Sequence, residues 1–173
     1  MLIASTARLT LRTAVLDDAP FYLALVNSPP FLRQLGDRGI RTLEDAVCAL
    51  VDGPIAMQAV RGHSLYIVEQ AGRAIGMCGL IKREELDGID LGYAFLPESQ
   101  GQGFACEAGK AVLDYANKQL GLRRILAIVS PGNEKSISVL QKLGFGFVKT
   151  IHLRTTDTGT FLYHFGNDAG AAT

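Results

Sequence analysis

The sequence predicts one α+β domain, built on a mixed but mostly antiparallel sheet flanked by helices. The expected order of elements is strand, helices, a three-strand meander, helix, strand, helix and two strands, an order typical of this fold class. A length of 173 residues suits one hydrophobic core and is too short for two full domains. A hydrophobic fraction of 48% indicates a globular chain. We therefore expect a single domain over residues 1–173, with its core at about 8–166 and a frayed tail at 167–173.

The first half of the chain predicts one strand followed by helices. Apolar and polar residues alternate over residues 8–13, as in a strand with one buried face. Helices are expected from Asp17 or Asp18 to Val26, briefly at 31–35, and from Thr42 to about 51, where Asp45 is placed to complete a capping box.

Two proline-containing segments are expected to end helices in this half. Ser28-Pro29-Pro30 should end the first helix, and Gly53-Pro54 should end the last. Residues 55–62 show no pattern that favours either a helix or a strand.

The second half predicts most of the sheet and two longer helices. Apolar runs bounded by turn residues indicate strands, and apolar residues at helical spacing before a glycine indicate helices. The expected strands are 64–69, 74–81, 89–96, 124–129, 145–153 and 160–165, and the expected helices are 103–118 and 134–143. A turn around Asp157 should join the last two strands.

Composition excludes several classes of function. Lys plus Arg and Asp plus Glu number 17 each, so the chain has no net charge to attract nucleic acid or an anionic membrane. No apolar run approaches the ~20 residues of a membrane span, and the first residues do not resemble a signal peptide. The three cysteines have neither disulfide nor metal spacing. These observations predict a cytoplasmic protein that needs no metal.

The segment Leu91–Gly109 is the strongest candidate for a ligand site. A strand ends there, a loop with Gly101 and Gly103 follows, and a helix opens. Glycines adopt backbone angles that other residues avoid and leave room for a phosphate. The first N–H groups of the helix then point at the anion. The sequence therefore predicts a phosphate-binding loop.

Two nucleotide-binding motifs fit this loop poorly. A P-loop needs four residues between its first glycine and Gly-Lys-Ser/Thr, whereas five separate Gly103 from Gly109 and Ala111 follows Lys110. A dinucleotide fingerprint needs a third glycine where Cys106 stands, and the next strand does not end in an acidic residue.

A second candidate segment runs from Asn133 to Phe145. Asn133 suits a helix N-cap, and Gly144 suits the stop after the helix. The same Asn133 amide, with Ser136 one turn further on, could instead contact a ligand. Both roles are open at this point.

The two segments together resemble the GNAT superfamily of N-acyltransferases. Gln100-Gly101-Gln102-Gly103-Phe104-Ala105 matches the acyl-CoA pyrophosphate loop of that family, and Asn133-x-x-Ser136 with Leu143-Gly144-Phe145 is similar to its second motif. The opening Arg8-Leu9-Thr10-Leu11-Arg12 resembles the subgroup that acetylates the N-termini of ribosomal proteins. The resemblance implies a splayed sheet with acetyl-CoA in the gap. The cofactor-binding residues that it implies are Phe95, Leu96, Gly101, Gln102, Gly103, Phe104, Ala105, Asn133 and Ser136.

The resemblance leaves the catalytic residues less well defined. Many family members have a tyrosine acid where this chain has Leu140, so Ser136 becomes the candidate partner of the departing thiolate. Asp90 is the first candidate base, although its interpretation as a solvated strand residue is slightly favoured. Glu84 and Glu85 are weaker candidates.

The implied reaction is direct attack of an amine on the acetyl thioester. An α-amine with a pKa near 8 costs about 1.4 kcal/mol to deprotonate at pH 7, against about 4.6 kcal/mol for a lysine. With no strongly placed base, this favours an α-amine, such as that of a protein N-terminus, or a proton that leaves through a water relay. The alternative is a non-catalytic acyl-CoA sensor of the same fold. The sequence identifies neither the acceptor nor the oligomeric state.

Overall fold

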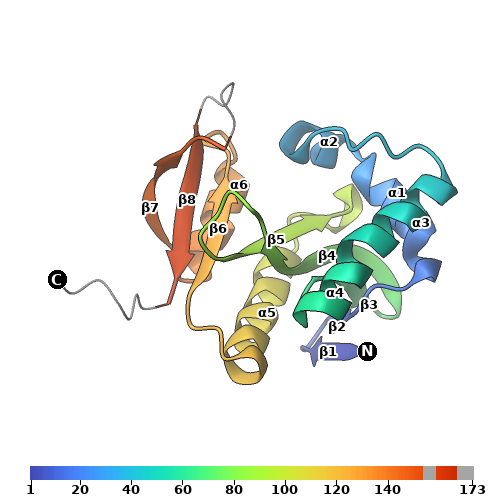
Figure 1. Ribbon diagram of the computed structural model, residues 1–173, viewed down its shortest axis with the longest axis horizontal. Coiled ribbons are helices and arrows are strands. Elements are labelled where there is room, and N and C mark those ends of the chain that lie inside the picture. The colour runs from blue at the N-terminus through green and yellow to red at the C-terminus, as the bar shows by residue number, and fades with distance from the viewer. Residues whose placement is uncertain (154–158, 167–173) are drawn as a thin grey trace.

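One sheet runs through the molecule and separates two groups of helices (Figure 1). Eight strands form it in the part of the chain that this computed structural model describes, residues 1–153 and 159–166. Their order across the sheet is β1-β2-β3-β4-β5-β6-β8-β7, and all neighbours are antiparallel except β5 and β6. The strands are β1 Leu2–Ser5, β2 Thr10–Arg12, β3 Leu65–Gln70, β4 Arg73–Lys82, β5 Ile89–Phe95, β6 Ile125–Val129, β7 Gly146–Ile151 and β8 Thr160–Phe165. The predicted mixed, mostly antiparallel sheet is confirmed.

The sheet splits between β5 and β6, the one parallel pair among the described strands. β4 and β5 stay paired along the length of β5, from Ile89 to Phe95. β5 and β6, in contrast, share a single bridge between Asp90 and Leu126. Past this bridge the two strands diverge (Figure 1), so the backbone of β5 loses its partner on that side. The splayed sheet expected from the family resemblance is therefore present.

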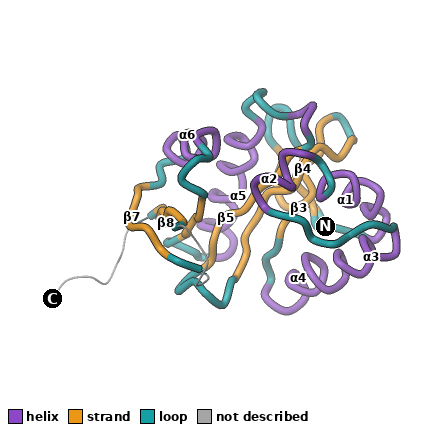
Figure 2. The backbone as a smooth tube through the Cα atoms, turned by 90° about the horizontal axis from the view of Figure 1, so that it is seen from above, coloured by secondary structure: helices purple, strands orange, loops and turns teal. Residues whose placement is uncertain are grey.

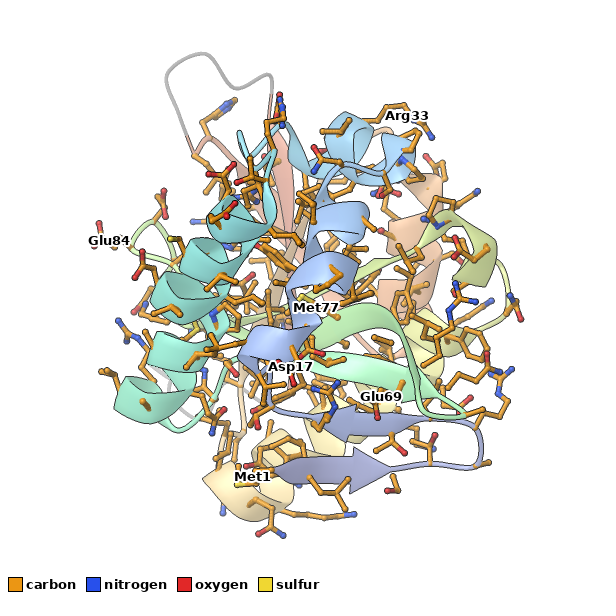
Figure 3. All side chains as sticks on the ribbon, turned by 90° about the vertical axis from the view of Figure 1, so that its right-hand side faces the viewer. Met1, Asp17, Arg33, Glu69, Met77 and Glu84 are labelled. Atoms are coloured by element: carbon orange, nitrogen blue, oxygen red, sulfur yellow. The ribbon has the colours of Figure 1, made fainter. Side chains whose placement is uncertain are left out.

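The helices cover both faces of the sheet. They are α1 Ala19–Val26, α2 Pro29–Leu35, α3 Leu43–Leu50, α4 Ala56–Arg61, α5 Phe104–Leu120 and α6 Glu134–Lys142. Figure 2 shows α5 and α6 on one side of the strands, and α3 and α4 on the other. The main hydrophobic core lies under α5, where Phe104 and Val112 pack against sheet residues such as Tyr66. A second core, which includes Met77 (Figure 3), lies under α1 and α3.

Two features of the first half differ from the sequence prediction. Leu2–Ser5 forms the edge strand β1, which was not predicted because its four residues carry no alternating pattern. Gly53-Pro54 does not end the helical region. A π-helical turn at Val51–Ile55, kinked at Gly53, leads directly into α4, so residues 56–61 are helical.

Ser28-Pro29-Pro30 has a second role besides the predicted one. The first helix does end at Val26, but the two prolines then occupy the first turn of α2. Proline suits that position because the first N–H groups of a helix have no intrahelical partner. The predicted capping box of α3 is confirmed: Thr42 Oγ1 accepts from the Asp45 N–H at 3.1 Å, and Asp45 Oδ2 accepts from the Thr42 N–H at 2.9 Å.

The remaining elements follow the prediction to within a few residues at their ends. The turn around Asp157 and the tail at 167–173 lie outside the described residues. Over the described ranges, no helix has both the length and the apolarity needed to cross a membrane.

Candidate active site

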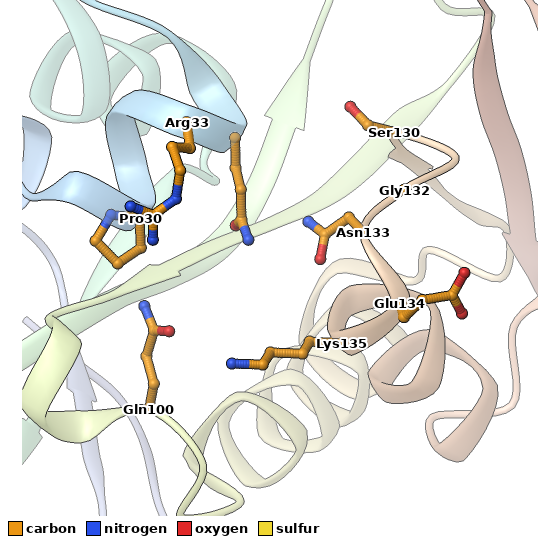
Figure 4. A pocket seen from close by; sticks show the side chains of 9 residues that line it. Pro30, Arg33, Gln100, Ser130, Gly132, Asn133, Glu134 and Lys135 are labelled. Atoms are coloured by element: carbon orange, nitrogen blue, oxygen red, sulfur yellow. The ribbon is translucent and has the colours of Figure 1, made fainter.

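The divergence of β5 and β6 opens a cleft of about 1150 Å³. Its walls come from β5, the loop before α5, the first turns of α5 and α6, and α2 with the segment after it. A smaller hollow of about 450 Å³ lies where α2 faces the start of α6 (Figure 4). In that view Gln100 and Lys135 lie below Arg33, and Asn133 lies beside them. Two segments about thirty residues apart, the glycine loop and the Asn133 turn, thus share one cavity.

Most of the residues predicted for the site line this cleft. They are Asp90, Phe95, Gly101, Gly103, Phe104, Ala105, Asn133 and Ser136. Leu96 and Gln102 are not among the residues that line it.

The glycine loop has the geometry of an anion site. Gly101 and Gly103 have φ angles of +74° and +81°, in the left-handed region that favours glycine. Glu107 is the first residue after the loop whose N–H makes a helical hydrogen bond, which it donates to Gly103 O at 3.1 Å. Among the described residues, the N–H groups of 101–106 have no backbone acceptor. Unpaired N–H groups at the start of a 17-residue helix suit a phosphate.

A cation that the sequence did not reveal holds this loop from behind. Arg8 forms an ion pair with Glu107, with Nη2 at 2.6 Å from Oε2, and donates from Nη1 to Gln102 O at 3.0 Å. Its guanidinium also lies 4.6 Å from the ring centre of Phe104. Burial disfavours the charge of Glu107, but hydrogen bonds from Thr6 and Arg8 outweigh this effect and lower its pKa. Arg8 precedes β2 and lies 94 positions before Gln102 in the chain, so the sequence alone does not show that it contacts the loop.

The backbone of β5 corrects one expectation. Leu96 donates its N–H to Ile75 O at 2.9 Å, and its carbonyl accepts from the Ser99 N–H at 2.9 Å. Leu96 therefore has no free N–H for a ligand, and its carbonyl is already occupied. Because backbone groups alternate in direction along a strand, Tyr93 and Phe95 are the residues whose groups point towards the gap.

Asn133 fills its predicted structural role and still has a donor to spare. Its Oδ1 accepts from the Ser136 N–H at 3.2 Å and caps α6. The Nδ2 group has no protein acceptor in the described part of the chain and lines the cleft. Tyr93 lies beside this turn, and its hydroxyl donates to Ser136 O at 3.5 Å. Burial raises the pKa of Tyr93 to about 12, so the phenol stays protonated. Leu140, which stands where many family members have a tyrosine acid, is buried in the core.

Asp90 is buried and paired, so its interpretation as a solvated strand residue is wrong. Its side chain is 1% exposed. Both carboxylate oxygens accept from Arg83 Nε, at 3.1 and 3.2 Å. Burial raises the pKa of Asp90 above its usual value, and the Arg83 charge opposes this only in part. A carboxyl with a raised pKa beside a cleft is a candidate proton acceptor. Glu84 and Glu85 are exposed and do not line the cleft.

Metal-binding clusters of three or more His, Cys, Asp or Glu residues do not occur within residues 1–153 and 159–166. The polar groups that line the cleft include backbone amides, amide side chains, hydroxyls, the Tyr93 phenol, carboxylates such as the ion-paired Asp90, and cations such as Arg83. Together they suit hydrogen bonding to an extended ligand and transfer of a proton.

Comparison with known proteins points to one family. The model of the acetyltransferase (GNAT) domain matches residues 8–146. YkkB of Bacillus subtilis is 36% identical over 94 residues, which are 52% of this chain and 55% of that protein, so the match spans only about half of that relative. The N-acetyltransferase p20 of Bacillus licheniformis is 31% identical over 144 residues, covering 81% of this chain and 80% of p20.

The fold agrees with these matches. The structure of RimL, a ribosomal L7/L12 α-N-protein acetyltransferase in complex with coenzyme A, superposes with a TM-score of 0.83 over 98% of this chain and 100% of RimL, at 18% identity. The family resemblance and the acyltransferase class predicted from the sequence are confirmed by the domain match and by p20. This chain belongs to the GNAT family of acetyltransferases.

Proposed function

We propose that this protein transfers the acetyl group of acetyl-CoA to a primary amine. The observation that carries the proposal is the shared cleft: the unpaired N–H groups of the glycine loop and the unpaired edge of β5 open into one cavity. The first suits a pyrophosphate and the second suits an extended amide-containing arm, as in strand addition. RimL, which shares the fold, was solved with coenzyme A bound.

Different residues of the cleft would bind different parts of acetyl-CoA. The N–H groups of Gly101, Gly103 and the first turn of α5 would bind the pyrophosphate, where each charge-assisted bond contributes about 1.5–3 kcal/mol. Tyr93 offers its backbone groups and Phe95 its N–H to the pantetheine arm, because the Phe95 carbonyl already accepts from Gln100 Nε2 at 3.2 Å. Asn133 offers Nδ2. Gln102, predicted as a binding residue, takes a supporting role because its carbonyl is bound by Arg8 and its side chain donates to Glu98 O at 2.9 Å.

Two side chains are proposed to handle the protons of the reaction. Acetyl-CoA supplies an acetyl thioester, which a neutral amine attacks so that a C–N bond forms and the C–S bond breaks. Asp90 accepts the proton that the amine nitrogen loses, directly or through one water. Ser136 donates a hydrogen bond to the departing sulfur, and the Tyr93 phenol, which stays protonated, donates to the carbonyl of Ser136. CoA leaves as a thiolate that takes up a proton from water, and Asp90 returns its proton to water, so the products are an amide and the free thiol of CoA.

The acceptor in this proposal is a primary amine. RimL is named as an α-N-protein acetyltransferase, which supports a protein α-amine as the acceptor. An amine-bearing small molecule is equally compatible with the cleft. The cytoplasmic location expected from the sequence also remains a prediction.

Titration calorimetry with acetyl-CoA and a thiol-release assay over an amine and peptide panel test this function. We expect binding with one site per chain and thiol release with at least one amine. A folded protein that fails to bind CoA would refute the proposal. Binding without thiol release for any amine would instead favour the acyl-CoA sensor, which shares the cleft but not the chemistry.

A further inference from the structure

We propose that the acceptor carries an anionic group close to its amine, and that Arg83 binds this group. The inference deepens the proposed acetyl transfer and rests on it. It concerns the end of the cleft at Asp90, which the donor-binding residues leave unassigned.

Arg83 is held in a way that leaves its terminal nitrogens available. Its Nε makes both contacts to Asp90, at 3.1 and 3.2 Å. A guanidinium has five N–H donors, and four of them are on Nη1 and Nη2. These two atoms have no hydrogen-bond partner in the described part of the chain. The Arg83 side chain is 32% exposed and lines the cleft. A fixed guanidinium with a free planar fork is suited to a carboxylate or a phosphate.

The position of Arg83 excludes the phosphates of CoA as its ligand. Asp90 lies five residues before Phe95 on β5, a distance of ~17 Å along the strand. The glycine loop follows the far end of β5. Side chains also alternate between the faces of the sheet, so Asp90 points away from the face on which Leu91 and Phe95 pack beneath α5. Arg83 therefore lies at the end of the cleft where the acceptor would meet the acetyl group.

The other charged side chains near this end do not bind the free donors of Arg83. Lys82 Nζ donates to Leu86 O at 2.5 Å, and Asp37, across the cleft, is paired with Arg41. Arg38, which also lines the cleft, lies over the ring of Phe31 at 6.0 Å and forms no ion pair among the described residues. Asp90 and Asp37 are thus already ion-paired, while Arg83 and Arg38 still have free donors. Glu134 also lines the cleft, at the start of α6, and forms no ion pair among the described residues. This balance favours an acidic acceptor over a polycationic one.

Bound in this way, an acceptor would also be oriented for the reaction. Arg83 would hold its anionic group through Nη1 and Nη2 and hold Asp90 through Nε. The amine would then lie near the carboxylate that takes its proton. Arg83 would act as a specificity and positioning residue for the acceptor.

Pairs of acceptors that differ in one charge provide the test. The amidated tripeptides Ala-Asp-Ala and Ala-Asn-Ala, and the small amines 4-aminobutyrate and 4-amino-1-butanol, are compared by thiol release, with spermidine as a polycationic acceptor. For at least one pair we expect kcat/KM to be about tenfold higher for the anionic member, the effect of one charge-assisted contact. In Arg83→Lys, which keeps a cation beside Asp90 but loses the planar fork, this ratio should fall to about one-third or less of its wild-type value. The exposed Arg61, outside the cleft, gives the control Arg61→Gln, which should keep the ratio unchanged.

The ratio separates this inference from the proposed function. A loss of chemistry in Arg83→Lys lowers both rates and cancels in the ratio, and the acetylated tripeptides compared by calorimetry give the same ratio from binding alone. Equal rates for both members of every pair, or a preference for spermidine, would overturn the anionic acceptor while leaving acetyl transfer intact. No thiol release with any amine would overturn acetyl transfer, and the inference with it.

Discussion

Arg8 and Glu107 are separated by 99 positions in the chain and are joined by an ion pair and two further hydrogen bonds. Arg8 Nε lies 2.7 Å from Glu107 Oε2, and the Arg8 N–H lies 3.1 Å from Oε1. Through Nη1 the same guanidinium binds the carbonyl of Gln102, in the middle of the glycine loop. The start of the sheet and the proposed pyrophosphate site are therefore one connected unit.

Removal of Arg8 should weaken acetyl-CoA binding through charge. Glu107 lies in the first turn of α5, close to the proposed phosphates, and without Arg8 its carboxylate would repel them. We expect Arg8→Gln to raise the KM for acetyl-CoA about tenfold with a smaller change in kcat. Steady-state kinetics at two salt concentrations measure this effect, which should shrink as salt screens the repulsion.

The double variant Arg8→Gln/Glu107→Gln separates repulsion from simple loss of support. If the unpaired carboxylate is the cause, removing it as well should restore most of the affinity. A double variant as weak as Arg8→Gln would show instead that Arg8 acts only by shaping the loop. Arg73→Gln, which removes an exposed ion pair with Glu98, serves as the arginine control.

Gly103 should be required for binding as well as for stability. Its φ of +81° is unfavourable for any residue with a Cβ, by ~1–2 kcal/mol. In Gly103→Val we expect CoA binding to fall below detection in calorimetry, because relief of the strain would turn the loop amides away from the cleft. Gly121, which ends α5 with a φ of +66°, offers a matched control. Gly121→Val should lose a similar free energy of unfolding and keep its affinity for CoA.

The role of Asn133 can be divided into a cap and a ligand contact. Asn133→Ala removes both and should cost about 1 kcal/mol in the free energy of unfolding. Asn133→Ser keeps a capping oxygen and lacks Nδ2. If Nδ2 binds the pantetheine arm, both variants should bind CoA about tenfold more weakly, although only Asn133→Ala is destabilised. Chemical denaturation and calorimetry on the same samples measure the two effects. Normal affinity in Asn133→Ser would leave Asn133 with the cap alone.

Local chemistry explains what the sequence predicted well. The glycine loop, the Thr42 capping box and the Asn133 cap each depend on residues within about six positions of one another, and all three are present. Short-range rules such as these need no knowledge of the sheet. The same rules gave the mixed sheet, because turn lengths and apolar runs fix which strands are neighbours.

Long-range contacts and strand register explain what the sequence missed. Arg8 with Glu107 connects segments whose proximity depends on the whole sheet. The expectation for Leu96 failed because the direction of a backbone N–H depends on register, and a shift of one residue reverses it. A charged residue such as Asp90 is expected at the surface. Its burial is explained by the ion pair with Arg83, which the sequence does not reveal.

The activity should depend on pH through Asp90. Burial raises the pKa of this carboxyl above 3.8, and it must be ionised to accept a proton. As the pH falls through this raised pKa, Asp90 gains a proton and kcat should fall, so the acid limb of the profile lies above the ordinary range of an aspartate. Asp90→Asn should remove this limb and lower kcat by about 10²–10⁴.

Arg83 determines the direction in which this limb moves. The Arg83 charge lowers the pKa of Asp90, so in Arg83→Gln the pKa should rise further and the acid limb should shift to higher pH. Profiles of kcat at saturating amine, compared between wild type, Arg83→Gln and the surface control Arg61→Gln, measure the shift. An acid limb that stays in place in Arg83→Gln, or survives in Asp90→Asn, would assign the titration to another group. The proton would then leave the amine by a route that does not involve this buried ion pair.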